Sequence, residues 1–189
     1  MLSAPTPSVT SGGKSGGGSK PKTKSNADIE RYHVVDKKIE VQERLFASIE
    51  EQIEEVYSTS GLNAFSDALD NINSQLDLQN QKMQEAEGYL EDDIAAFEES
   101  GLKIDRDEAG NIKNWYELQQ SLNEMYNAAG EERQEEIEKY YDILESIEDT
   151  ISTIRDIEDA ITDNIRKQVD LRYQKIEKTA EFYEKAADR

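Results

Sequence analysis

The chain has 189 residues, of which 42 are acidic and 22 basic, so its formal net charge is −20. It contains one histidine and no cysteine, which excludes disulfides, cysteine nucleophiles and multi-histidine metal sites built from one chain. The acidic excess argues against nucleic acid as a partner of the body of the protein, because phosphate binding needs clustered lysine and arginine. No apolar run approaches the roughly 20 residues of a membrane-spanning segment.

Apolar residues make up 35% of the chain and charged residues 34%, which is too polar for an ordinary globular core. A coiled coil needs only about two apolar positions in every seven. The composition therefore favours long helices that bury a narrow apolar seam.

Residues 1–26 hold all three prolines, five of the ten glycines and four lysines, without one acid. This composition is typical of a flexible linker, and we expect a disordered N-terminal tail. Its four lysines also suit a loose contact with the acidic helices or with a polyanion.

Residues 27–100 are predicted to form a first helical arm, since no proline follows Pro21. Apolar residues recur in steps of three and four, with a break near residues 58–61 where Gly61 offers a helix end. Gln42 and Gln79 interrupt the seam, either as tolerated exposed glutamines or as residues that fix register. The predicted seam residues of this arm include Ile39, Phe46, Ile49, Ile53, Val56, Leu69, Ile72 and Leu76.

Residues 101–114 lose this periodicity and are predicted to form a small β-hairpin. Leu102 and Ile104 alternate with polar residues before the turn. The predicted turn residues are Asp107, Gly110 and Asn111, of which the last two tolerate a positive φ.

Residues 115–189 are predicted to form a second helical arm. Asn114 with Glu117 resembles a capping box and places the helix start at Trp115, and Gly130 offers an interruption of this helix. Beyond residue 154 the apolar residues step by four, which makes the stripe drift around the helix. The predicted seam residues of this arm are Ile137, Leu144, Ile147, Ile151 and Ile154, and those of the drifting part are Ile157, Ile161, Ile165, Val169 and Ile176.

Residues 28–100 and residues 115–187 both span 73 positions, so two equal arms can pair around the central turn. The predicted fold is all-α: a long antiparallel coiled-coil helical hairpin with arms of about 110 Å. The alternative is a parallel homo-oligomer, with which isoleucine-rich seams are also compatible. Self-association and intramolecular helix pairing are thus both open.

Few residues invite a chemical role. Asp105, Asp107 and Gly110 match the first, third and sixth positions of a calcium loop, but Ala109 and Tyr116 fail at the fifth and twelfth. We predict no catalytic, cofactor-binding or metal-binding residue, and no enzyme. His33 is read as a helix-flank residue. The aromatic residues near the turn are expected in packing, or alternatively in a contact surface: Trp115, Tyr140 and Tyr141.

The order of these segments resembles coiled-coil parts of tail tape measure proteins from long-tailed bacteriophages. The resemblance rests on the Gly/Ser/Lys-rich linker over residues 11–26, the sequence DIERYH at 28–33 and the sequence DEAGNIKNWYEL at 107–118. It covers most of residues 20–187. Members of that family are typically much longer, so the chain is similar to an internal segment or a short relative.

The resemblance implies a structural virion component located in the phage tail and assembled in the host cytoplasm. Its implied role is that of a tail-length ruler, and its implied partners are tail tube or tail-tip proteins. A helix suits a ruler because it converts residue count linearly into distance. The alternative is a cytosolic or host-side coiled-coil interaction module, either an adaptor or a chaperone.

Overall fold

The computed structural model describes residues 26–54 and 59–188. The chain divides into two compact units, Met1–Arg31 and Tyr32–Arg189. The described part of the first unit is the start of one helix, over residues 26–31. The predicted disordered tail and the predicted seam residue Val56 lie outside the described residues.

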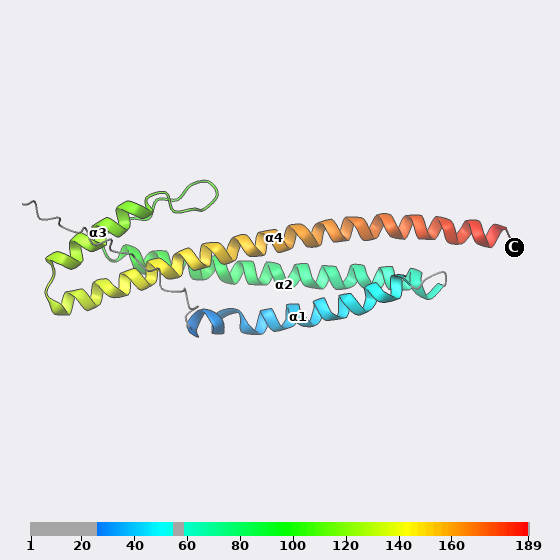
Figure 1. The fold of residues 1–189 in the computed structure, drawn as a ribbon, viewed down its shortest axis with the longest axis horizontal. Helices are drawn as coiled ribbons and strands as arrows, with labels where there is room; N and C mark the ends of the chain where they lie inside the picture. Colours follow the sequence, from blue (N-terminus) through cyan, green and yellow to red (C-terminus); the bar gives the residue numbers. More distant parts are fainter. Residues whose placement is uncertain (1–25, 55–58, 189) are drawn as a thin grey trace, which may run out of the picture. The chain divides into compact units, whose positions relative to one another are not determined.

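Four helices account for the regular structure of the described residues: α1 (Asn26–Glu54), α2 (Thr59–Glu98), α3 (Trp115–Ala128) and α4 (Glu131–Ala187) (Figure 1). No strand occurs in residues 26–54 or 59–188. None of the described helices is long and apolar enough to span a membrane. The protein is thus mostly helical, as its composition predicts.

Helices α2 and α4 run antiparallel and pack along most of the length of α2. Four contacts show the direction, because residue numbers fall along α2 while they rise along α4. In order, these contacts are Ser146 Oγ to Asp93 Oδ2 at 2.8 Å, Asn164 Nδ2 to Gln79 Oε1 at 3.1 Å, Gln168 Nε2 to Asn73 Oδ1 at 2.6 Å and Lys175 Nζ to Ser66 Oγ at 3.1 Å.

The first predicted arm, with its predicted break near residues 58–61, is two helices, α1 and α2, which lie side by side rather than end to end. Helix α1 ends at Glu54. The part of α1 that begins at Tyr32 packs alongside α2. Asp36 pairs with Lys82 at 2.6 Å, and the rings of Tyr32 and Tyr89 meet edge to face. This packing buries the apolar seam of α1 against α2. In one extended arm, α1 and α2 would follow each other, and neither seam could cover the other. The prediction of equal arms was therefore wrong.

The second predicted arm is also divided. Ala129 and Gly130 are extended, with ψ of 152° and 170°, so α3 ends and α4 begins in a new direction. Helix α3 then packs back on α4 through Leu118 and Leu122. The chain turns here because α3 alone has an apolar face that only a neighbour can cover.

The loop over residues 101–114 does not form the predicted β-hairpin. Its β-type pairing is one isolated antiparallel bridge, between Arg106 and Ile112. The side chain of Asn114 bonds both the Lys103 carbonyl oxygen and the Asp105 N–H, at 2.8 and 2.9 Å. Beyond the bridge, the side chain of Asn114 takes the place of backbone partners for Lys103 and Asp105. The backbone pairing is therefore too short to form strands.

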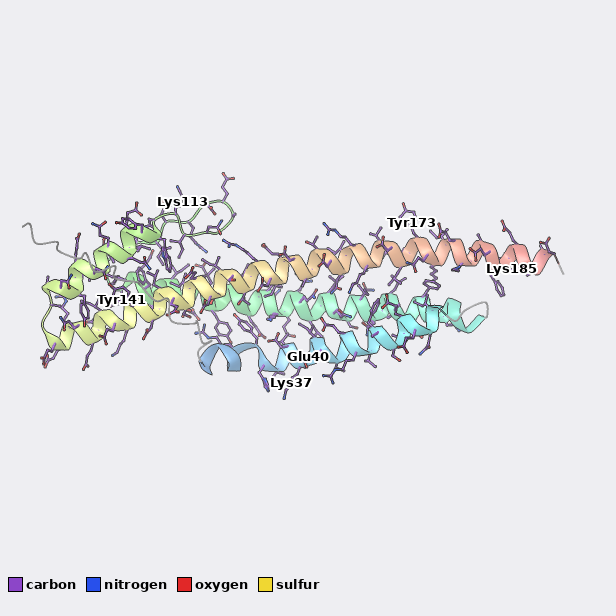
Figure 2. All side chains as sticks on the ribbon, in the orientation of Figure 1. Lys37, Glu40, Lys113, Tyr141, Tyr173 and Lys185 are labelled. Carbon is purple, nitrogen blue, oxygen red and sulfur yellow. The ribbon has the colours of Figure 1, made fainter. Side chains whose placement is uncertain are left out.

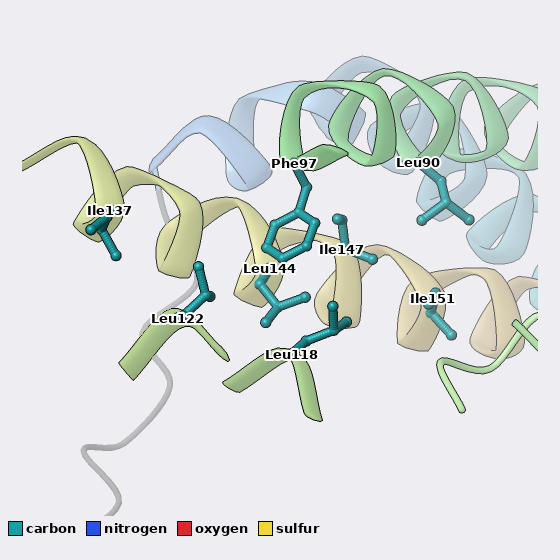
Figure 3. Packing of buried hydrophobic residues seen from close by; sticks show 8 residues of the cluster. All are labelled: Leu90, Phe97, Leu118, Leu122, Ile137, Leu144, Ile147 and Ile151. Atoms are coloured by element: carbon teal, nitrogen blue, oxygen red, sulfur yellow. The ribbon is translucent and has the colours of Figure 1, made fainter. Parts of the chain in front are cut away.

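Among residues 26–54 and 59–188, the interior contains three groups of apolar residues. The largest joins α2, α3 and α4 (Figure 3), the second is centred on Phe65 and Ile72, and the third joins Tyr32, Ala86 and Ile157. Twelve of the predicted seam residues, between Ile39 and Ile154, divide evenly by burial. Phe46, Ile72, Ile137, Leu144, Ile147 and Ile151 are buried, while Ile39, Ile49, Ile53, Leu69, Leu76 and Ile154 are partly buried.

Candidate functional site: an amide layer between three helices

A continuous line of side-chain amides crosses the interior where α1, α2 and α4 meet. Helix α1 contributes Gln42, α2 contributes Asn71, Gln75 and Gln79, and α4 contributes Asn164. We call these five residues the amide layer. The four on α2 and α4 are at most 7% exposed, and Gln42 is partly buried.

Each neighbouring pair in the amide layer is joined by a hydrogen bond. Asn71 Nδ2 donates to both oxygens of Gln42, the side-chain Oε1 at 2.9 Å and the backbone oxygen at 3.0 Å. Gln75 Nε2 donates to Asn71 Oδ1 at 2.8 Å. Asn164 Nδ2 then donates to Gln79 Oε1 at 3.1 Å and to Gln75 Oε1 at 3.3 Å.

Helical spacing explains why these amides can meet. Asn71, Gln75 and Gln79 are four residues apart, so they lie on one face of α2. Asn164 lies seven residues after Ile157 and seven before Leu171, and both of those are buried. It therefore occupies a core position of α4.

The amide layer specifies how the helices align. A buried amide without a partner costs about 1–3 kcal/mol, so sliding one helix past another is penalised. Apolar seams alone tolerate such sliding more readily, since their contacts are not directional. The arrangement has no evident catalytic chemistry, because primary amides do not titrate near neutral pH.

Sequence reasoning identified part of this layer. The sequence leaves two roles open for Gln42 and Gln79, tolerated exposed glutamines or residues that fix register, and in the structure both bond across helices. Asn71, Gln75 and Asn164 were missed. The heptad spacing of Asn164 between Ile157 and Leu171 is the signal that identifies it.

The predicted turn residues lie together in the loop between α2 and α3. Gly110 has a φ of 82°, a region that favours glycine. The backbone N–H and the side-chain amide of Asn111 donate to the two carboxylate oxygens of Asp107, at 2.9 and 3.0 Å. These bonds, chiefly that of the side chain, lower the pKa of the exposed Asp107 carboxyl below its ordinary value.

The carboxylates of the loop bond to their own chain. Asp107 is held by Asn111, and Asp105 lies 3.6 Å from Lys113 in an exposed ion pair. In the part of the chain that the structure describes, no group of three or more histidine, cysteine, aspartate or glutamate side chains is arranged to hold a metal ion. His33 is exposed.

The aromatic residues near the loop pack against the largest apolar group. Trp115, Tyr140 and Tyr141 are all partly buried there. The Tyr140 ring meets Phe97 edge to face, and the Tyr141 hydroxyl donates to Asn123 Oδ1. Burial is the main cause that raises the pKa of both tyrosines. These contacts are those of packing residues.

Comparison with protein-family models, curated proteins and solved structures finds no match to this chain.

Proposed function

We propose that the protein is a non-enzymatic structural component that holds helices at fixed positions within a larger assembly. The amide layer carries this proposal, because it aligns α1, α2 and α4 through directional bonds within a buried interface. A fixed alignment of helices suits a protein whose role depends on where its helices begin and end.

The resemblance to tail tape measure proteins suggests the assembly in question. We propose a phage tail, with tail tube or tail-tip proteins as partners and a coiled-coil spacer as the role. Helix α4 is the element best suited to set a distance, since its 57 residues correspond to about 85 Å.

The fold does not support a ruler in which every residue of the chain adds to the length. Helices α1 and α3 fold back on their neighbours, so part of the chain does not add to the length. The spacer is therefore the paired part of α2 and α4. Its length depends on both helices together.

A matched insertion tests this role. Seven residues are added to α2 after Glu91 and seven to α4 after Glu148, two points that face each other between the contacts of Asp93 with Ser146 and of Gln79 with Asn164. The paired part should lengthen by about 10 Å while its thermal stability is kept. The control adds the residues to α2 alone, which breaks the alignment and should lower the stability.

In a bacteriophage that encodes this chain, electron microscopy of purified particles then measures the tails. A spacer role predicts longer tails with the matched insertion, and mass spectrometry should find the chain in the particle. Tails of unchanged length, or particles without the chain, would contradict the proposal.

A host-side adaptor is the second candidate, and one observation favours it. The seams of α1 and α2 and that of α4 up to Ile161 cover one another within a single chain, so this part of the fold does not need a tube wall to bury them. Affinity purification from the native source separates the two. Tail proteins among the recovered partners support the spacer, and cellular proteins alone support the adaptor.

A further inference from the structure

The apolar stripe of α4 leaves the interior of the molecule near residue 161. Ile157 is 4% exposed and Ile161 is partly buried, whereas Ile165 is 47% exposed and Val169 45%. The cause is the four-residue step, which advances the stripe by about 40° each time on a helix of 3.6 residues per turn. An interface that is covered at Ile157 therefore continues as an uncovered surface.

The uncovered stripe extends along the last third of α4. Its members after Val169 are Tyr173, Ile176 and Tyr183, all about two-thirds exposed, and Figure 2 labels Tyr173 among them. Leu171 keeps the inner position in the same segment, at 6% exposed. This part of α4 thus has a second apolar face besides the one packed within the chain. We call it the outer stripe: Ile165, Val169, Tyr173, Ile176 and Tyr183.

The charge of α4 changes at the same point. Residues 131–161 hold twelve acids and three bases, whereas residues 162–188 hold six of each. Two copies of this strongly acidic chain repel each other over most of their surfaces. The segment with the outer stripe carries no net charge, so there the repulsion is absent.

One pair of charges beside the outer stripe is complementary when the segment is reversed. Arg166 and Glu184 each follow a stripe residue by one position, Ile165 and Tyr183, so they lie on the same flank. In an antiparallel helix pair related by a two-fold axis, like flanks face each other. A pairing centred between residues 174 and 175 brings Arg166 to the level of Tyr183 and Glu184 of the second copy.

The same pairing matches the apolar residues. Val169 lies at the level of Ala180 of the second copy, and Tyr173 at the level of Ile176. Within the single chain, Arg166 contacts Asp163 of its own helix at 3.5 Å in an exposed ion pair. Such a pair contributes little to stability, so it does not prevent Arg166 from contacting Glu184 of a second copy.

We propose that two copies of the protein dimerise through the outer stripe, with the last third of α4 paired antiparallel about a two-fold axis. This inference is independent of the proposed function. One helix pair of this length is a small interface, so we expect a Kd of roughly 10–100 µM.

Sedimentation equilibrium of the full chain, from 5 µM to 1 mM in 0.15 M salt, tests the dimer. Replacing Val169 and Ile176 together by serine should raise the Kd about 100-fold or more. The matched control replaces Val41 and Leu45 of α1, which are 52% and 50% exposed, and should leave the Kd unchanged. Circular dichroism checks that each variant is folded. A monomer at all concentrations overturns the proposal, as does a dimer that only the α1 variant weakens.

A charge exchange tests the identity of the occupant. Arg166→Glu and Glu184→Arg should each weaken the dimer, because like charges then face each other, and the two together should restore it. Restoration requires that the second copy supplies the opposing residue. A double variant weaker than either single variant overturns the pairing.

Spin labels distinguish the orientation, since the chain has no cysteine of its own. Thr162→Cys places one label near the start of the outer stripe. An antiparallel pair sets the two labels about 38 Å apart along the helices, from 25 residues at 1.5 Å each. A parallel pair sets them about one helix spacing apart, near 10 Å, and that result overturns the antiparallel arrangement.

Discussion

The side chain of Asn164 in α4 donates a hydrogen bond to Gln79 in α2, with 3.1 Å between Nδ2 and Oε1. The two residues are 85 positions apart in sequence, and each is 5% exposed. A directional contact of this kind aligns two long helices, whose apolar contacts alone leave several alignments close in energy.

Asn164→Ala should lower the free energy of unfolding by about 1–3 kcal/mol, because two buried glutamine oxygens lose this donor. Urea denaturation followed by circular dichroism measures the loss. The control is Gln168→Ala, which removes an exposed bond to Asn73 that water can replace. It should cost less than about 0.5 kcal/mol. Equal losses would mean that burial of the amide layer has no energetic importance.

Sequence periodicity predicted which positions face the interior. Twelve predicted seam residues between Ile39 and Ile154 are at least partly buried, including Ile72 and Ile147 at 0% exposed, whereas Ile165, Val169 and Ile176 of the drifting part are exposed. The reason is that position on a helix is a local property, set by 3.6 residues per turn. The choice of partner is not local. The apolar seam of α1 is compatible with an arm that continues into α2 and with a helix that packs back on α2. Only the packing against α2 decides between these two arrangements.

The loop and the amide layer also show that local sequence does not predict contacts with distant residues. Turn chemistry at Asp107, Gly110 and Asn111 was readable, since it depends on neighbours in sequence. The side chain of Asn114, expected as a helix cap, instead bonds residues nine and eleven positions away. Asn164 likewise depends on residues of α2. Asn71, Gln75 and Asn164 do not interrupt the predicted seam as Gln42 and Gln79 do, so the sequence pattern does not single them out.

Gly110→Ala should destabilise the protein by about 1 kcal/mol, because a φ of 82° is strained for a residue with a Cβ. The matched control is Gly88→Ala within α2, where a Cβ also meets no atom within 4 Å. That change should stabilise by about 0.5–1 kcal/mol, since alanine favours the helix. Thermal unfolding of both variants gives opposite shifts in Tm. A stabilising Gly110→Ala would contradict the backbone geometry of the loop.

Acid should open the turn at Asp107. Because Asn111 lowers the pKa of this carboxyl in the folded protein, its contribution is present above the ordinary aspartate pKa. The contribution is lost as the pH falls through the lowered value. A pH titration of the Asn111 amide by NMR should show its midpoint below the ordinary pKa. Asp107→Asn should abolish that inflection, and a midpoint at or above the ordinary value would contradict the bonds to Asn111.

The tip formed by α3 and the start of α4 depends on buried apolar residues of the largest group. Leu122 is 0% exposed and lies near Ile137 and Leu144 in Figure 3. Leu122→Ala should therefore cost about 2–5 kcal/mol, because it leaves a cavity between the two helices. The control, Gln119→Ala on the exposed side of α3, should change stability by less than about 0.5 kcal/mol.

Hydrogen exchange locates the effect of Leu122→Ala. Protection should fall first in α3, which is short and packs on α4, while the amides near the amide layer keep theirs longer. The reason is that α3 has 14 residues and gains most of its stability from this one apolar face. If protection in α2 and α4 fell equally at residues 71–79 and 157–171, the tip and the amide layer would unfold as one cooperative unit.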